Sequence, residues 1–208
     1  MGKREHLIGE IVRAEWRMFQ NVRNAGGRAP CQDDEQTFRI MRESQSAGWS
    51  DETLESYLDD LKLAENEGRN LLSEKYARMM KSTSPVEYSE IESLLPPLDA
   101  QVADLIDRIA VVVLDWEKEL TKKFPHVLAK GRPLFTTKDS PVSTSLETYL
   151  RGELATYSLK TLERYWSNLE KQKAAGINGA AVIMAHMVKQ SGFNSLEEAN
   201  EKLKPKCI

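Results

Sequence analysis

A carboxylate on an apolar helix face is the first feature of this sequence that could do chemistry. The apolar residues before Asn24 recur at the spacing of one helix face: Ile8, Ile11, Val12, Met18, Phe19 and Val22. The same period puts Glu15 on that face, where a leucine would be expected. A buried carboxylate without a partner costs several kcal/mol or takes up a proton instead. Glu15 is therefore either a general base or one half of a structural ion pair.

The next helical segment offers a partner for Glu15. Phe38 and Met41 define its apolar face, and the helical period puts Arg42 and Gln45 on or beside that face. We predict that Glu15 is ionised because it meets a guanidinium, from Arg42 or from Arg28, and that this pair joins the first two helices.

The segment between these helices, residues 24–31, carries a glycine pair followed by an arginine. Arg28 after Gly26 and Gly27 can bind a carboxylate or phosphate with two parallel hydrogen bonds, and the glycines let a ligand approach the backbone. The alternative is a turn with an exposed arginine. The segment lacks the GxxxxGK[ST] pattern of a phosphate-binding loop.

The cysteines give no strong catalytic signal. Cys31 precedes a predicted helix start, where the helix dipole lowers a thiol pKa and favours a nucleophile. No histidine partner is identifiable, so we predict a small, buried, reduced thiol. Neither Cys31 nor Cys207 lies in a CxxC or Cys/His cluster, which gives no support for a disulfide framework or a zinc site.

Two features of the second half add candidate binding residues. Lys130 and Arg132 flank a glycine in a loop of about eighteen residues, and loops of that length are often functional or disordered. The pair suits an anion, although a solvated loop is the alternative, and we predict that residues 130–139 close over the site at Arg28. Glu153 follows Leu146 by seven residues and so faces inward, either as a second functional carboxylate or as a packing residue.

These residues together predict a polar pocket that binds a small anionic or zwitterionic metabolite, with the cofactor and reaction unassigned. The proposed ligand-binding residues are Glu15, Arg28, Asp34, Arg42, Gln45, Lys130, Arg132 and Glu153. The competing interpretation is a non-catalytic interaction or accessory domain whose partner is another protein. No metal site is predicted, because neither His126 nor His186 follows a glutamate by three residues, as a di-iron bundle would require.

Composition sets the broad class of the protein. The chain has 208 residues, of which 29% are charged and 40% hydrophobic, which is typical of one folded domain spanning residues 1–208. The net charge of -3 gives no reason to expect a nucleic acid partner. The longest apolar run, residues 109–114, is far short of a membrane span, and the N-terminus lacks the apolar core of a signal peptide. We therefore expect a cytoplasmic protein that does not contact membranes.

Helical periodicity and capping residues predict an all-α, single-domain bundle of seven or eight helices with no sheet. Asp33 or Asp34 should cap the second helix, and Gly68 should lie on the inward face of the third, where another helix or a ligand could approach. The helix after Asp99 has the most apolar stripe and should be the central one. Predicted helices span about residues 4–23, 51–81, 85–95 and 99–124, and another runs from about residue 145 through Tyr165. One helix follows Asp33 or Asp34, one runs from Asn178 through Met187, and a short last one begins at Ser195.

A resemblance to a known family is carried by two long stretches and a shorter one between them. The stretches are EWRMFQNVRNAGGRAPCQDDEQTFRIMRESQ, EGRNLLSEKYARMM and KGRPLFTTKDSPVSTSLETYLRGELATYS. They resemble a bacterial family catalogued only as a domain of unknown function, and the resemblance covers nearly the whole chain. It implies no reaction, cofactor or catalytic residue. It does imply that similar domains occur beside nucleotidyltransferase-like domains in longer chains, which would suit an accessory role.

Overall fold

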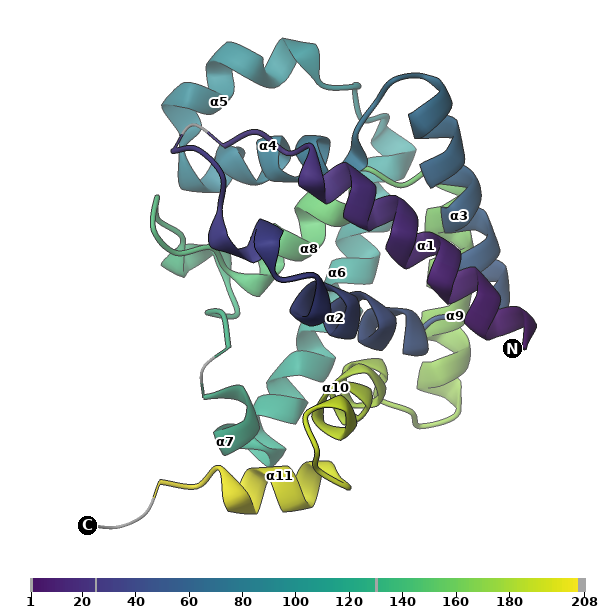
Figure 1. Cartoon of the computed structure of the whole chain (residues 1–208), viewed down its shortest axis with the longest axis vertical. Helices are drawn as coiled ribbons and strands as arrows, with labels where there is room; N and C mark the ends of the chain where they lie inside the picture. The colour runs from purple at the N-terminus through teal and green to yellow at the C-terminus, as the bar shows by residue number, and fades with distance from the viewer. Residues whose placement is uncertain (1, 25, 130, 206–208) are drawn as a thin grey trace.

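The computed structural model describes residues 2–24, 26–129 and 131–205, and these residues form an all-α fold (Figure 1). Eleven α-helices make up most of the described chain, and no strand is present in it. The helices are α1 (Lys3–Gln20), α2 (Glu35–Ala47), α3 (Asp51–Asn66), α4 (Leu71–Thr83), α5 (Pro85–Ile91), α6 (Ala100–Lys123), α7 (Pro125–Leu128), α8 (Leu146–Leu154), α9 (Leu159–Ala174), α10 (Gly179–Gln190) and α11 (Leu196–Lys202). Three short 3-10 helices lie at Pro30–Asp33, Glu92–Leu94 and Thr136–Lys138. The predicted all-α class is confirmed, whereas the expected number of helices was too low.

One predicted helix, residues 51–81, is two helices. α3 ends at Asn66, and Gly68 takes a left-handed conformation with φ of +71°. The Arg69 amide donates to the Ala64 carbonyl over 2.8 Å, as in a glycine-terminated helix end. Asn70 then caps α4 by accepting from the Ser73 amide. The inward Gly68 was therefore a wrong prediction, because this glycine is exposed and turns the chain.

A second predicted helix, residues 145–165, is also two helices. α8 ends at Leu154, and Ser158 caps α9 by accepting from the Thr161 amide over 3.2 Å. The apolar spacing continues across this break through Tyr157, which is buried at 5% exposure. Because the spacing is unbroken, the hydrophobic pattern alone could not reveal the turn.

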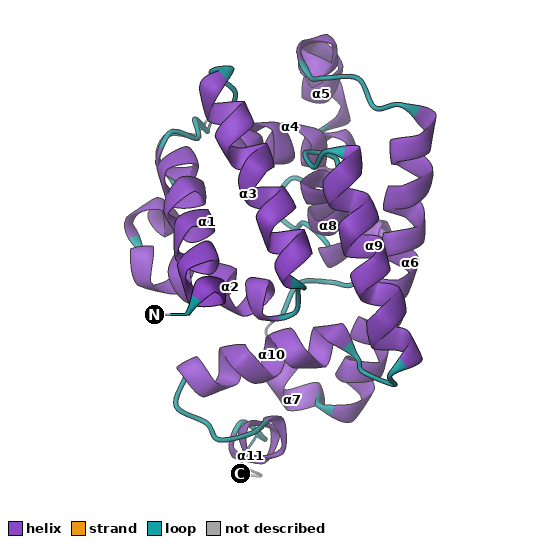
Figure 2. Cartoon of the chain, turned by 90° about the vertical axis from the view of Figure 1, so that its right-hand side faces the viewer, coloured by secondary structure: helices purple, strands orange, loops and turns teal. Residues whose placement is uncertain are grey.

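The helices that carry the site lie against one another in the middle of the molecule. Figure 2 shows α3 between α1 and α9, with α6 beyond α9. α2 packs on both α1 and α10, and α4 packs on α8. α6 is an outer wall and not the predicted central helix: it buries one face, including Ile109 at 0%, and leaves Val111 58% exposed.

α4 and α8 approach closely at Gly152. A Cβ atom at this position would lie 2.8 Å from the Met79 Cγ and 3.0 Å from the Lys75 carbonyl oxygen. No side chain larger than hydrogen fits there without moving α4. Because residue 152 is a glycine, α8 can approach α4 this closely, and Glu153 then lies within reach of Lys75 on α4.

Among the helices described, none combines the length and the apolar character that crossing a membrane would require.

Candidate functional site

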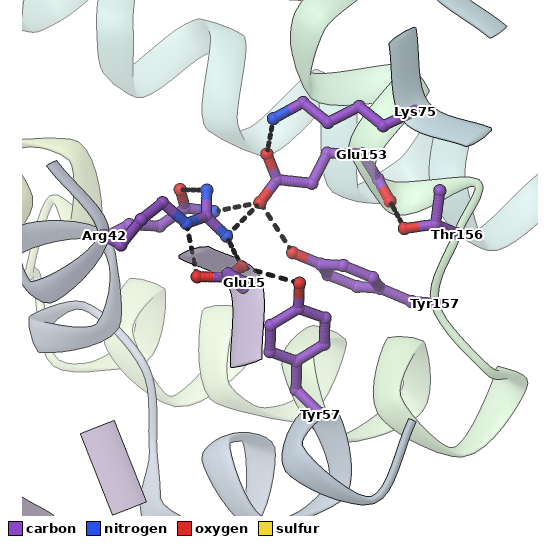
Figure 3. Close-up of polar contacts among 8 residues, drawn as sticks. Glu15, Arg42, Tyr57, Lys75, Glu153, Thr156 and Tyr157 are labelled. Atoms are coloured by element: carbon purple, nitrogen blue, oxygen red, sulfur yellow. Dashed lines mark hydrogen bonds and ion pairs between the residues drawn. The ribbon is translucent and has the colours of Figure 1, made fainter. Parts of the chain in front are cut away.

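The predicted pair between Glu15 and Arg42 is present and buried (Figure 3). Glu15 is 0% exposed on α1, and the Arg42 Nε donates to Glu15 Oε2 over 2.7 Å. The Arg42 Nη2 donates to the other oxygen, Oε1, which also accepts from the Tyr57 hydroxyl over 2.8 Å. The prediction that a guanidinium from the second helix meets Glu15 is confirmed, with Arg42 as the partner.

Glu153 extends this pair into a network. Its Oε1 accepts from Arg42 Nη2 over 3.0 Å, from Gln45 Nε2 over 2.7 Å and from the Tyr157 hydroxyl over 2.9 Å. Its Oε2 accepts from the Lys75 Nζ over 2.5 Å. Helices α1, α2, α3, α4 and α8 thus meet through one set of charged and hydrogen-bonded side chains. We call Glu15, Arg42, Gln45, Tyr57, Lys75, Glu153 and Tyr157 the buried network.

Sequence reasoning missed Lys75, which is 4% exposed. It lies four residues after Leu71 and four before Met79, both buried, so the helical period places it on the inward face of α4. The argument that identified Glu15 would have identified Lys75 as well. Tyr57 and Tyr157 were not among the predicted site residues either, although their hydroxyls donate to the carboxylates.

The network keeps Glu153 and Arg42 charged. Burial alone would raise the pKa of Glu153, but Arg42 and Lys75 outweigh it and hold the pKa well below the usual value for glutamate. Burial would lower the pKa of Arg42, but Glu15 and Glu153 outweigh it and raise the pKa. Burial, together with the nearby carboxylates, raises the pKa of Tyr57 and Tyr157, so both hydroxyls remain donors.

The charges in the network cancel. Glu15 and Glu153 carry two negative charges, and Arg42 and Lys75 carry two positive charges. Each carboxylate also has a tyrosine hydroxyl, so the hydrogen-bonding capacity of the oxygens is largely used within the protein.

A cavity of about 200 Å³ lies over one side of the network. Its inner end is formed by four network residues, Arg42, Tyr57, Lys75 and Glu153. Its walls are mainly aromatic and aliphatic, and the exposed residues of the lining mark its opening. The remaining lining residues are Phe19, Cys31, Asp34, Thr37, Phe38, Met41, Leu71, Leu72, Tyr76, Arg132, Tyr149 and Thr156.

Arg132 brings the long loop to this cavity. Its guanidinium Cζ lies 4.9 Å from the centroid of the Tyr149 ring, and its Nη1 donates to the Thr144 carbonyl over 3.3 Å. The Lys75 Nζ lies 3.5 Å from the same ring centroid. Unlike Lys75, Arg132 forms no ion pair with a carboxylate in residues 2–24, 26–129 and 131–205. Lys130, the other predicted cation of the loop, lies outside the described residues.

The loop is held in place by Asp139. Its carboxylate accepts from the Ser145 amide and the Ser82 hydroxyl, over 2.5 Å and 2.6 Å, and from the Thr148 hydroxyl. These contacts fix the loop to both α4 and α8. The Leu146 amide also donates to the Pro133 carbonyl over 2.8 Å, which holds the residue next to Arg132 against the start of α8.

Arg28 does not line the cavity. Its Nε donates to Asp33 Oδ1 and its Nη2 to the Gln32 carbonyl, both over 2.8 Å, and it also bonds the Gln20 side chain. Arg28 thus stabilises the turn between α1 and α2, and the long loop meets the cavity at Tyr149 and not at Arg28. Asp34 does line the cavity, and it caps α2 by accepting from the Thr37 amide over 2.9 Å.

Cys31 is exposed, which makes the prediction of a buried thiol wrong. It is a free thiol at the cavity opening, and Cys207 lies outside the described residues. We expect Cys31→Ser to change the free energy of unfolding by no more than about 0.5 kcal/mol, as is usual for exposed positions. Urea denaturation of both proteins measures this difference, and a loss above about 1.5 kcal/mol would show that the thiol supports the fold.

No metal-binding group is evident in the described part of the chain, where no three His, Cys, Asp or Glu side chains are placed to hold an ion. The buried carboxylates already bind Arg42 and Lys75. The residues that remain available to a ligand are those of the cavity wall and opening.

The fold and site define an all-helical protein with a neutral buried ion network beneath an apolar cavity. The chain belongs to the family described as "Protein of unknown function (DUF4125)", which matches residues 5–201. The matched span contains the whole network, and the resemblance to an uncharacterised family is confirmed. No curated protein and no solved structure matches the chain.

Proposed function

We propose that the cavity binds a small anionic or zwitterionic metabolite and that the protein does so in the cytoplasm. The observation that carries the proposal is Arg132, a cation at the cavity without a carboxylate partner in the described chain. Its planar guanidinium suits a carboxylate or phosphate. Asp34 at the same cavity offers a carboxylate to a ligand that also carries an ammonium group.

The buried network favours binding over proton transfer. A general base works best when its pKa lies near the operating pH, and Arg42 and Lys75 hold the pKa of Glu153 far below that range. The network therefore forms the inner end of the cavity, and its charges sum to zero. The proposal is one of binding, and it assigns no cofactor.

A thermal-shift screen against metabolites and nucleotides tests this proposal. A ligand present at about 100 times its Kd stabilises the native state by ~2.7 kcal/mol, which raises the Tm measurably. We expect Arg132→Gln to weaken any anionic hit by about 1.5–3 kcal/mol, the usual size of a charge-assisted hydrogen bond.

The matched control is Arg108→Gln, because Arg108 also lies over an aromatic ring, Trp166 at 4.3 Å, but on α6 and outside the cavity lining. This variant should leave the shift unchanged. A screen without any anionic hit, or hits equally strong in the Arg132 variant, would count against the proposal.

A second function has one observation in its favour. Large apolar side chains are exposed on α5 and the segment after it: Val86 at 72%, Leu94 at 80% and Leu98 at 42%. Figure 1 shows α5 at one end of the molecule. Apolar side chains on such a projection suit contact with another protein. In this alternative the chain is an accessory domain, and a nucleotidyltransferase-like domain is the proposed partner.

A further inference from the structure

We propose that the ligand of this cavity is an amphipathic monoanion, in which a single acidic group is attached to an apolar ring; this inference rests on the proposed function. The walls, the inner end and the opening of the cavity each support one part of that description.

The walls favour an apolar ring. Phe19 and Phe38 stack with centroids 5.1 Å apart and an interplanar angle of 17°, and Tyr76 lies 6.3 Å from Phe19. All three line the cavity together with Leu71 and Leu72. An apolar ring is stabilised by the removal of its surface from water when it packs against such walls. The hydroxyls of a sugar placed against these rings would instead lose hydrogen bonds to water.

The inner end of the cavity offers little to a second polar group. The hydroxyl of Tyr57 donates to Glu15, and Arg42 donates to Glu15, Glu153 and Gln45. Lys75 donates to Glu153 and faces the Tyr149 ring. An added negative charge at this end would disturb a network whose charges already cancel. The ligand should therefore place its apolar part inward.

The opening supplies one cation for one acidic group. Arg132 lies beside the Tyr149 ring, which is itself part of the wall. A ligand whose acidic group binds Arg132 can thus extend its ring inward toward Phe38.

The volume fits a single ring. An apolar cavity of about 150 Å³ is known to accept benzene, and this cavity measures about 200 Å³. The difference leaves room for a short acidic side chain. A nucleotide or a polyphosphate would exceed the space and carry too much charge.

Titration calorimetry with three simple probes tests the inference: phenylacetate, acetate and inorganic phosphate. We expect phenylacetate to bind at least tenfold more tightly than either small anion, because only phenylacetate fills the apolar part. Arg132→Gln should weaken phenylacetate binding at least tenfold, and Arg108→Gln should not change it. Phenethylamine, which has the same ring with a cationic group, should bind at least tenfold more weakly than phenylacetate.

Trp16 reports whether the probe enters the cavity. Its ring lies 5.1 Å from that of Phe38, so a ligand against Phe38 should change the tryptophan fluorescence. Trp16→Phe should reduce that change while phenylacetate still binds, and Trp49, whose ring lies 5.4 Å from that of Tyr57, accounts for the remainder. A fluorescence change of full size in Trp16→Phe would place the probe away from Phe38 and overturn the inference.

The outcomes separate this inference from the proposed function. Phosphate or a polar metabolite could bind more tightly than phenylacetate, with an affinity that depends on Arg132. In that case the inference of an amphipathic ligand is wrong, but the proposed anion site is retained. If no anionic probe or metabolite binds in an Arg132-dependent way, both fail.

Discussion

Replacement of Glu15 by leucine is expected to lower the free energy of unfolding by about 3–5 kcal/mol, because it leaves a buried charge without its partner. Arg42 and Lys75 would then share the single carboxylate of Glu153, and the Tyr57 hydroxyl would lose its acceptor. The buried network would carry a net positive charge. Urea denaturation monitored by circular dichroism measures the loss.

The double variant Glu15→Leu with Arg42→Met should recover much of this stability. It removes one charge of each sign and leaves the pair between Lys75 and Glu153, which are 2.5 Å apart. Glu153 also keeps the hydroxyl of Tyr157. Replacement of both members of a buried pair by apolar residues is often close to neutral.

Glu10→Leu on the same helix is the matched control. Glu10 pairs with Lys62 over 3.3 Å at the surface, and exposed pairs contribute about 0–1 kcal/mol. The single variants Glu15→Leu and Arg42→Met are measured separately. If the double variant loses as much free energy of unfolding as these two variants lose in sum, the charges do not act as a pair. If the double variant recovers its stability but no longer binds phenylacetate, the buried network also supports the cavity as a binding site. If the double variant still binds phenylacetate, the buried network serves only the stability of the fold.

Glu117→Gln is expected to stabilise the protein above neutral pH. Glu117 on α6 lines a second cavity of only about 30 Å³, together with Tyr165 and Gln172. Burial raises the pKa of Glu117 to about 7 from its ordinary value of 4.5. Gln172 Oε1 is buried there as well, without a hydrogen-bond partner in the described chain. The cavity therefore offers Glu117 no cation to offset its burial.

The direction of the pH effect follows from the raised pKa. Between about pH 4.5 and 7 the folded protein holds a proton on Glu117 that the unfolded chain releases, so stability falls as the pH rises through this range. Glutamine has no proton to release. At pH 8 we expect Glu117→Gln to raise the free energy of unfolding by about 1–3 kcal/mol, since each pKa unit corresponds to ~1.36 kcal/mol and partial solvent access reduces the total.

Denaturation curves at pH 4 and pH 8 measure this prediction. The gain should appear at pH 8 and be nearly absent at pH 4, where both states are protonated. Glu170→Gln, at an exposed position of α9, is the control for the removal of one carboxylate from the protein surface. A gain of equal size at both pH values would mean that the effect comes from side-chain packing and not from ionisation.

The sequence by itself determined the all-α class and the inward direction of several polar side chains. The period of 3.6 residues places Glu15 among buried residues of α1, and the same rule directs Arg42 and Glu153 inward. Buried charges need partners, so the pairing of Glu15 with a guanidinium followed from local pattern and electrostatics. The same reasoning applied to α4 would have included Lys75.

The tertiary structure decided which inward faces meet. Lys75 and Glu153 lie 78 positions apart, and their contact depends on the close approach of α4 and α8 at Gly152. Periodicity fixes the face of each helix but carries no information about its neighbour. The breaks after Asn66 and Leu154 were also invisible to it, because the apolar spacing continues through both turns.

The loops depended most on tertiary structure. Arg28 and Arg132 both follow a glycine in a polar segment, so the sequence gives no reason to separate them. Arg28 bonds its own turn through Asp33, whereas Asp139 fixes the other loop to α4 and α8 and places Arg132 at the cavity. Loop residues have no repeating spacing that fixes their direction, and long-range hydrogen bonds determine it instead. For that reason only the fold could show which arginine lines the cavity.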